Sequence, residues 1–457
     1  MFLDCSSTIA VNLPALHYGI AVSDIDGDGR FEFVVAGYGG PNRVLRWHDG
    51  QLFDIAPRSL ADAERQTICI LAADYDGDGR EELYFQNADT FSGPKSAPDR
   101  LMDHDPTTGQ WSDLFLRPIN KPMRNIVSGR SVAALDRRGN GRYSFAVANY
   151  AAPMRLYEQG SEGQLVDIAP AIGLNRIMGG RGLWTGPLSS DRADLFCANE
   201  RGSNLFFRNT GLGTFLEIAV ELGLHDETEH ARGVAVLDAD GDGRLDVAWA
   251  NWEGPHRLMI RRADGSFKNR ATLAMALPSA NRNVIAADFD NCGFEELFFN
   301  NHGEPNRLFR QIDGNWRMID AGEATLPAGY GTGAAVADTD GDGRLELLIS
   351  HGEKAPQPLA LLKGEENANG WIRFAPRTRF GAPARGSLIR LIAGGRTQLR
   401  VVCGGSGYLC QMEPVAHFGL GKAESVESVR IQWPDGATAT LANPEIRRMH
   451  DVPYPTR

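Results

Sequence analysis

Short apolar runs recur along this chain, and each is followed by an acidic, glycine-rich segment and then by a second apolar run. In one such unit, residues 233–237 and 247–250 are apolar and residues 238–246 lie between them. Apolar runs of this length, bounded by turn signals, are typical of buried β-strands. The pattern therefore predicts two strands joined by an acidic loop, and it is also found at residues 19–36.

The units follow one another at intervals of about 50 residues, which is typical of repeat architectures. The first aspartates of the recognisable loops are Asp24, Asp74, Asp136, Asp238, Asp288 and Asp338. The interval between Asp136 and Asp238 is twice the usual one, so we expect a hidden unit whose loop lies at residues 186–194. This makes seven units.

Each unit continues with a polar connection, a third strand, a glycine turn and a fourth strand. In five units the connection ends in a Pro-x-Arg element, at residues 41–43, 98–100, 153–155, 255–257 and 305–307. Four antiparallel strands in each repeated unit are typical of propeller blades. The sequence therefore predicts an all-β fold, with a seven-bladed β-propeller at residues 1–385 and a small β domain at residues 386–457.

The two ends of the chain differ from the repeat. Residues 1–4 resemble an extra copy of the fourth strand, so we expect them to pair with the last blade and close the ring. From about residue 386 the repeat stops, and residues 387–392, 398–402 and 429–433 are expected to form strands of the C-terminal module.

Four of the acidic loops share the pattern Asp-x-Asp-Gly-Asp-Gly followed by an acidic residue at loop position 9. Carboxylates this dense repel one another unless a cation lies between them, and several oxygen ligands favour calcium. The backbone carbonyl at position 7 would supply a further oxygen. About four structural Ca²⁺ ions are therefore expected, bound by Asp24, Asp26, Asp28, Arg30 and Glu32; Asp74, Asp76, Asp78, Arg80 and Glu82; Asp238, Asp240, Asp242, Arg244 and Asp246; and Asp338, Asp340, Asp342, Arg344 and Glu346.

These loops differ from EF-hands, which need a bidentate glutamate at position 12 and helices on both sides. In the other three units the pattern is degenerate. Arg138 replaces a ligand in the third unit and is expected to act as the cation there, the fourth unit keeps only Asp194, and Cys292 stands at position 5 of the sixth. We expect no calcium in the third and fourth units, and weak or no binding in the sixth.

The acidity of the chain agrees with bound metal. The 457 residues have a formal net charge of −11, and the four loops contain 16 of the 58 carboxylates. Such a charge argues against nucleic acid or an anionic membrane surface as a partner. No apolar run is long enough to span a membrane, so no membrane insertion is expected. With scattered cysteines and no signal-like start, the chain is expected to be cytoplasmic, or secreted if a signal peptide was removed.

The loops and their flanking strands resemble FG-GAP/VCBS repeats. The C-terminal segments at residues 404–409, 417–421 and 431–436 resemble the ASPIC/UnbV domain. Together they resemble the cartilage-acidic-protein/UnbV family, a resemblance that implies a calcium-stabilised seven-bladed propeller with a C-terminal β appendage. Animal members of that family are extracellular adhesion or matrix proteins. Bacterial members occur with polyketide biosynthesis, notably of enediynes, and the family offers no settled catalytic motif.

The face opposite the acidic loops should carry a ring of basic and aromatic side chains around a central mouth. Such a ring suits an anionic or phenolic small molecule, with arginine as a bidentate donor and aromatic rings as walls. The candidate ligand-binding residues are Tyr18, Arg130, Tyr150, Arg181, Arg232, Trp252, His302 and Tyr330. His230 and Glu200 are candidate general acid–base groups.

Two functions remain open at this point. The first is a calcium-stabilised propeller that binds, and if it is an enzyme transforms, a polyketide-like or phenolic ligand as a cofactor-independent cyclase or alkylating enzyme. The second is a non-catalytic scaffold for protein binding or adhesion. Equally, the arginines could bridge neighbouring blades, and the aromatic side chains could only fill the channel.

Overall fold

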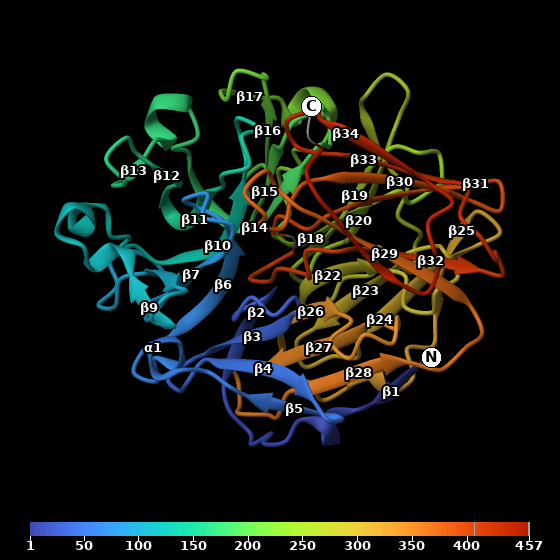
Figure 1. Cartoon of the computed structure of the whole chain (residues 1–457), viewed down its shortest axis with the longest axis horizontal. Helices are drawn as coiled ribbons and strands as arrows, with labels where there is room; N and C mark the ends of the chain where they lie inside the picture. Colours follow the sequence, from blue (N-terminus) through green and yellow to red (C-terminus); the bar gives the residue numbers. More distant parts are fainter. Residues whose placement is uncertain (406, 456–457) are drawn as a thin grey trace.

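The computed structural model describes residues 1–405 and 407–455, and within them nearly all regular structure is β-strand (Figure 1). The predicted all-β class is confirmed. The strands that precede the C-terminal module form runs of four, and each run begins at the molecular axis and ends at the outer edge. Two short helices, α1 (Arg58–Ala61) and α2 (Ala219–Leu222), lie in connections between runs.

The first runs are β2 (His17–Ser23), β3 (Glu32–Gly37), β4 (Arg43–His48), β5 (Gln51–Asp54); β6 (Thr67–Ala73), β7 (Glu82–Asn87), β8 (Arg100–Asp105), β9 (Gln110–Asp113); and β10 (Gly129–Leu135), β11 (Ser144–Pro153), β12 (Arg155–Gln159), β13 (Leu165–Asp167). The later runs are β14 (Ile177–Gly186), β15 (Asp194–Asn199), β16 (Leu205–Asn209), β17 (Phe215–Glu217); β18 (Ala231–Leu237), β19 (Asp246–Asn251), β20 (Arg257–Arg261), β21 (Phe267–Asn269); β22 (Asn281–Ala287), β23 (Glu296–Asn301), β24 (Arg307–Ile312), β25 (Asn315–Ile319); and β26 (Gly331–Ala337), β27 (Glu346–His351), β28 (Ala360–Gly364).

The first strand of each run contacts the first strand of the next, from β2 through β6, β10, β14, β18 and β22 to β26, which contacts β2 again. The hidden unit expected near residues 186–194 is the run β14–β17. The long strand β11 pairs with β12 through one part and with β14 through another, so two runs share one eight-stranded sheet. The number of seven separate blades therefore stays a prediction.

The inner strands are apolar throughout because both of their faces are covered. Ile20, Ala21 and Val22 are completely buried. Glycine recurs at the point where a neighbouring backbone passes closest: a Cβ atom on Gly19 would lie 2.3 Å from the Leu409 carbonyl oxygen and 2.7 Å from that of Ile68. A side chain there would push the strand away from its neighbours.

The N-terminus completes the last run, as predicted. Strand β1 (Phe2–Asp4) pairs antiparallel with β28, with Phe2 opposite Gly364, and Figure 1 shows the two strands side by side. The Phe2 ring is buried and lies 4.8 Å, centroid to centroid, from the ring of Phe289. The first residues of the chain thus form the fourth strand of its last propeller sheet.

The C-terminal module consists of two small sheets with a core of its own. Their strands are β29 (Gly370–Pro376), β30 (Leu388–Ala393), β31 (Arg396–Val401), β32 (Ala416–Gly421), β33 (Ser428–Gln432), β34 (Thr438–Ala442) and β35 (Met449–Val452). β29 pairs with β32 and β35, although it precedes the boundary expected at residue 386, because the end of the repeat pattern does not mark the start of the next sheet. Ser406, in the segment that resembles the ASPIC/UnbV domain, and residues 456–457 lie outside the described residues.

The module covers the face of the propeller that carries the acidic loops. The Arg390 guanidinium donates to the Gly243 carbonyl at 3.1 Å, and Arg373 pairs with Asp338 at 2.8 Å. Between β31 and β32 the chain enters the propeller axis. We call residues 403–405 and 407–413 the axial segment; Gln411 there bonds by its backbone to Ile20 and Val22 of β2.

Arg385 anchors the module in this axis. Its buried guanidinium binds the carboxylate of Glu81 and donates to the carbonyls of Val22, Cys403 and Met412. The change Arg385→Ala leaves the buried Glu81 without its counter-ion, so we expect the free energy of unfolding in urea to fall by about 3–5 kcal/mol.

The matched control is Arg379→Ala, which removes an exposed partner of Asp435 at 3.0 Å and should cost less than about 1 kcal/mol. Equal losses in the two variants would show that Arg385 does not anchor the module.

Candidate functional site

The four acidic loops share one backbone arrangement. Each joins an inner strand to the second strand of its run, and the first aspartate accepts the N–H of the glycine at position 6, as in Gly243 to Asp238 at 3.0 Å. The acidic residue at position 9 accepts the N–H of position 2, as in Ala239 to Asp246 at 2.8 Å. Gly241 and Gly243 have φ values of 74° and 80°, which glycine adopts without strain.

Burial makes the carboxylates at loop positions 1 and 9 costly to ionise without a cation. It raises the pKa of Asp74 and of Asp246 to about 7, and neighbouring carboxylates add to the effect. A bound divalent cation would stabilise the ionised forms.

The residues present fit a calcium ion. The carboxylate oxygens of Asp338, Asp340, Asp342 and Glu346 lie within 4.8 Å of one another, and smaller groups form in the first and second loops. In the fifth loop the buried Oδ1 of Asp238 has no hydrogen-bond partner among the described residues. Calcium, when bound, would supply positive charge to these oxygens and hold the loop backbone. Calcium binding itself stays a prediction.

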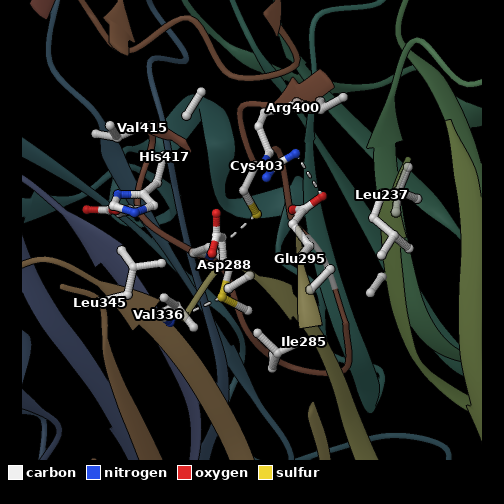
Figure 2. Close-up of a pocket in the computed structure, with 18 of the residues that line it drawn as sticks. Leu237, Ile285, Asp288, Glu295, Val336, Leu345, Arg400, Cys403, Val415 and His417 are labelled. Carbon is white, nitrogen blue, oxygen red and sulfur yellow. Dashed lines mark hydrogen bonds and ion pairs between the residues drawn. The ribbon is translucent and has the colours of Figure 1, made fainter. Parts of the chain in front are cut away.

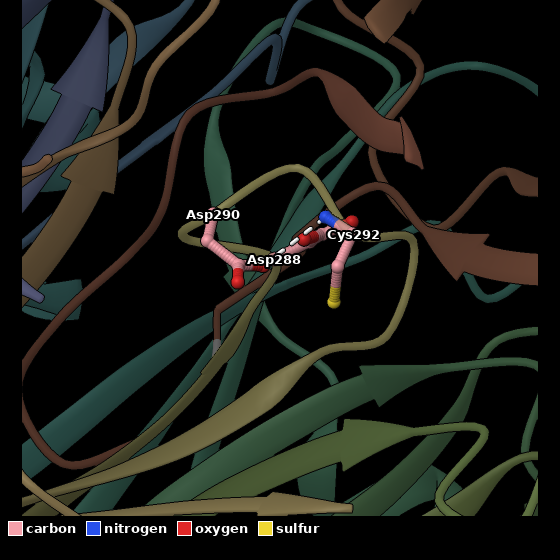
Figure 3. A group of neighbouring side chains, drawn as sticks. All are labelled: Asp288, Asp290 and Cys292. Atoms are coloured by element: carbon pink, nitrogen blue, oxygen red, sulfur yellow. Dashed lines mark hydrogen bonds between the residues drawn. The ribbon is translucent and has the colours of Figure 1, made fainter. Parts of the chain in front are cut away.

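The degenerate loops are arranged differently. In the sixth loop Asp288, Asp290 and Cys292 lie together (Figure 3), and burial raises the pKa of the Cys292 thiol, which disfavours the metal-binding thiolate. In the third, the cationic side chain is Arg137, which binds Glu158, and not Arg138, which is exposed. Asp194 of the fourth accepts hydrogen bonds from Ser189, Ser190 and Asn209.

The predicted arginines converge at the opposite end of the axis. Arg130, Arg181 and Arg232 occupy matching positions on successive inner strands and are buried. Their guanidinium groups surround a side chain that the axial segment supplies: Tyr408 accepts a hydrogen bond from Arg181 at 2.9 Å, and the Arg232 carbon Cζ lies 5.7 Å from its ring centre. The centre of the predicted ring is therefore occupied by the chain itself.

Two residues of this site, Arg282 and Tyr408, were not predicted from the sequence. Arg282 follows Arg232 by one repeat of 50 residues, so the repeat alone could have identified it. Tyr408 could not be found in this way, because nothing in the sequence shows that a segment of the C-terminal module enters the axis. Although burial opposes it, the cluster of Arg181, Arg282, Arg232 and Arg130 lowers the pKa of Tyr408 to about 8.

The candidate acid–base groups take part in this packing. Glu200 pairs with Arg181 and with Arg232, and these charges hold its pKa below its usual range despite burial. An ionised carboxylate held between two guanidinium groups acts as their counter-ion. His230 is exposed, and its Nδ1 contacts the Glu200 backbone carbonyl. The ion pairs of Glu200 and the contact of His230 supply neither side chain with a nucleophile or a second acid–base group with which it could carry out catalysis.

The aromatic side chains among the predicted ligand-binding residues form walls around the mouth of the propeller axis. Trp252 lies between Arg232 and Arg282, with Cζ atoms 4.3 Å and 4.5 Å from its ring centre, and Tyr150 lies beside Arg181. The rings of His302 and Tyr330 are 5.3 Å apart. The ring of Tyr18 contacts that of Tyr38, with ring centres 5.1 Å apart. Basic and aromatic side chains thus lie around the mouth, whose middle Tyr408 fills, and ligand binding by them stays a prediction.

A cavity of about 100 Å³ lies at the other end of the axis, between the module and the ends of the inner strands. Figure 2 shows Asp288, Glu295, Arg400, Cys403 and His417 around it, with Arg400 paired to Glu295 at 3.3 Å. Ligand pockets are usually several times larger, whereas this volume suits a few water molecules. It offers no room for a polyketide-sized ligand.

The sequence matches two protein families. Residues 378–457 match the family described as ASPIC and UnbV, and residues 24–85, 189–249, 238–299 and 288–349 match the FG-GAP-like repeat. The match at 189–249 includes the hidden unit. The resemblance drawn from the sequence is thereby confirmed.

Cartilage acidic protein 1 of Xenopus tropicalis is 45% identical over 97% of this chain and 74% of its own length. The human protein of the same name is 43% identical over 97% of the chain and 73% of its own length. Among solved structures, BBS1N in complex with ARL6DN aligns with a TM-score of 0.50 at 10% identity, over 80% of this chain and 98% of that one. This likeness concerns the propeller fold alone.

Proposed function

The chain belongs to the cartilage acidic protein 1 family of FG-GAP-repeat proteins with a C-terminal ASPIC and UnbV domain, and we propose that it is a non-catalytic protein-binding scaffold held rigid by calcium. One observation carries this proposal: the axial segment fills the centre of the ring of arginine and aromatic side chains in which the sequence predicts a small-molecule ligand. Gly404 accepts the Ala134 N–H at 2.7 Å, and the Asn283 side chain donates to the Tyr408 carbonyl at 2.5 Å.

The module also determines which propeller face is open to a partner. It covers the acidic loops, so the opposite face remains, formed by the segments that lead into the inner strands and by those that join second to third strands. Large apolar side chains are exposed along these segments: Val11, Leu13, Phe91, Ile126, Ile177, Leu273 and Leu277. Exposed apolar groups on an open face supply contact area that a protein partner can bury.

The mouth adds polar recognition to this face. The Arg130 guanidinium carbon lies 5.2 Å from the ring centre of the exposed Phe91, and Trp252 lies over two further arginines. Arginine and aromatic side chains are enriched where binding energy concentrates in protein interfaces. The surface therefore favours a protein partner that presents apolar and acidic side chains together.

The experiment compares charged substitutions on the two faces. The partner is the protein that the wild-type chain captures from an extract of its source organism. Phe91→Asp and Ile177→Asp should each lower the affinity for this partner by at least about tenfold, because each places a carboxylate in an apolar contact. Affinity is measured with the purified partner by biolayer interferometry.

Leu212→Asp is the control, since Leu212 is equally apolar and 86% exposed but lies in the turn between β16 and β17, at the acidic-loop end. Equal binding by all three variants, or an equal loss in all three, would contradict the proposed surface.

A small anion at the arginine cluster is a second candidate. Arg181 and Arg232 pair with Glu200, and Arg282 pairs with Glu353, whereas Arg130 donates only to the backbone carbonyls of Gly129 and Phe91 among the described residues. The Nε atoms of Arg232 and Arg282 have no acceptor among the described residues. This surplus of positive charge would attract a carboxylate or sulfate that enters from the open face. The biosynthetic setting and the cyclase or alkylating activity stay predictions from the family resemblance.

Among the described residues, no helix is long and apolar enough to cross a membrane. A cytoplasmic or a secreted location stays a prediction, as does the absence of nucleic acid as a partner.

A further inference from the structure

The four acidic loops face different residues on the third strand of their units. The register that pairs Phe33 with Leu45 places Arg46 opposite Glu32, the acidic residue at loop position 9. In the last run Glu346 pairs directly with Lys363. We call this third-strand residue the opposing position; side chains at such paired positions lie close enough to interact.

Cations occupy the opposing position in the first and seventh loops. Arg46 contacts Asp26, and its Nε lies 2.9 Å from Glu32. The ammonium of Lys363 lies 2.6 Å from Asp340, 3.0 Å from Asp342 and 2.6 Å from Glu346. Each of these side chains neutralises the carboxylates that are expected to bind calcium.

The second loop has an acidic residue at the opposing position, where the first and seventh loops have a basic one. Asp103 stands opposite Glu82, because Leu83 pairs with Met102. Carboxylate oxygens of Asp103, Glu82 and Asp76 lie within 4.8 Å of one another, so this loop has a fifth acidic group. The other partner of Asp103 is the half-exposed Arg117, at 3.1 Å, which is no part of the loop. In the fifth loop the opposing residue is Ile260, which is uncharged and packs into an apolar cluster.

The sixth loop shows what a cation at this position does when the acidic pattern is incomplete. Arg310 stands opposite Glu296 and binds Asp290 at 2.6 Å and Glu296 at 2.7 Å. A guanidinium group thus takes the place between the carboxylates. This gives a physical reason for the weak or absent calcium binding expected there.

We propose that the opposing position grades the calcium affinities of the four loops. Asp103 raises the calcium affinity of the second loop, and the uncharged Ile260 does not alter that of the fifth. Arg46 and Lys363 lower the calcium affinities of the first and seventh loops, because each holds a tethered cation against the carboxylates that would bind calcium. The inference rests on the proposed calcium binding. Calcium must displace Arg46 or Lys363 before it reaches these oxygens, so the second and fifth loops fill at lower calcium concentrations.

Isothermal titration of the calcium-depleted full chain with calcium tests this. Arg46→Met and Lys363→Met should each raise the affinity of one weak site by at least about tenfold, because a unit charge a few ångströms from a divalent ion is removed. Asp103→Asn should lower the affinity of one tight site. Arg208→Met is the matched control, since Arg208 occupies the same strand position in the fourth unit, which lacks the acidic pattern.

Unchanged affinities in Arg46→Met and Lys363→Met, with four sites still titrating, would overturn the graded affinities and leave calcium binding intact. A chain that binds no calcium would instead refute the proposed function on which the inference rests. Melting temperatures in EGTA establish that each variant is folded, and the Lys363→Met result stands if Arg46→Met does not fold.

Discussion

Removal of calcium with EGTA is expected to lower the melting temperature of the chain by at least about 5 °C. A ligand that binds only the folded state at a hundredfold excess over its Kd stabilises that state by about 2.7 kcal/mol per site. Two filled loops would therefore contribute about 5 kcal/mol, which for a chain of this size corresponds to about 5 °C. Differential scanning calorimetry in calcium and in EGTA measures the difference.

A substitution in one acidic loop tests whether the calcium that stabilises the chain binds there. Asp240→Ala removes the exposed carboxylate at position 3 of the fifth loop and should reduce bound calcium by about one ion per chain, measured by equilibrium dialysis. Asp191→Ala is the control, because Asp191 is an exposed carboxylate in the loop of the fourth unit. A melting temperature that is the same with and without calcium would refute calcium binding by these loops.

Deletion of residues 1–4 is expected to destabilise the chain by about 5 kcal/mol or more. The loss of the buried Phe2 ring alone corresponds to about 3–5 kcal/mol. In addition, β28 loses the strand that covers its outer edge and exposes unpaired backbone groups. Urea unfolding followed by tryptophan fluorescence measures the change.

Two point variants separate packing from strand pairing. Phe2→Ala keeps the backbone of β1 and removes only the ring, so it should cost less than the deletion. Leu3→Ala affects a side chain that is 49% exposed and should cost little. A deletion as stable as the full chain would show that the N-terminus does not close the ring in solution.

The repeat made most of the propeller predictable. Inner strands, acidic loops and second strands follow from apolar runs and loop residues that recur every 50 residues, and Arg282 would follow from Arg232 in the same way. The N-terminal strand was predicted too, because residues 1–4 match the fourth strands of other units. These features depend on local pattern, which a sequence shows directly.

The filled axis could not be predicted. The axial segment has no property of its own that directs it into a channel. Its place depends on long-range contacts with β2, β10 and β14, among them the bond from Arg181 to Tyr408. The pairing of β29 could not be predicted for a related reason, because its partners lie 40 to 80 residues further along the chain.

The pairing of β1 with β28 also has a consequence for how the chain is made. Phe2 leaves the ribosome about 360 residues before its partner Gly364. At ordinary rates of translation this delay is about 20–70 s.

During that time the apolar N-terminal strand has no place in the fold, and the growing ring has an open end. The last step of propeller assembly therefore waits until β28 has been synthesised, even if each earlier sheet folds as it emerges. The Phe2 side chain, which is buried in the folded chain, therefore stays exposed to solvent until β28 is available to pair with β1.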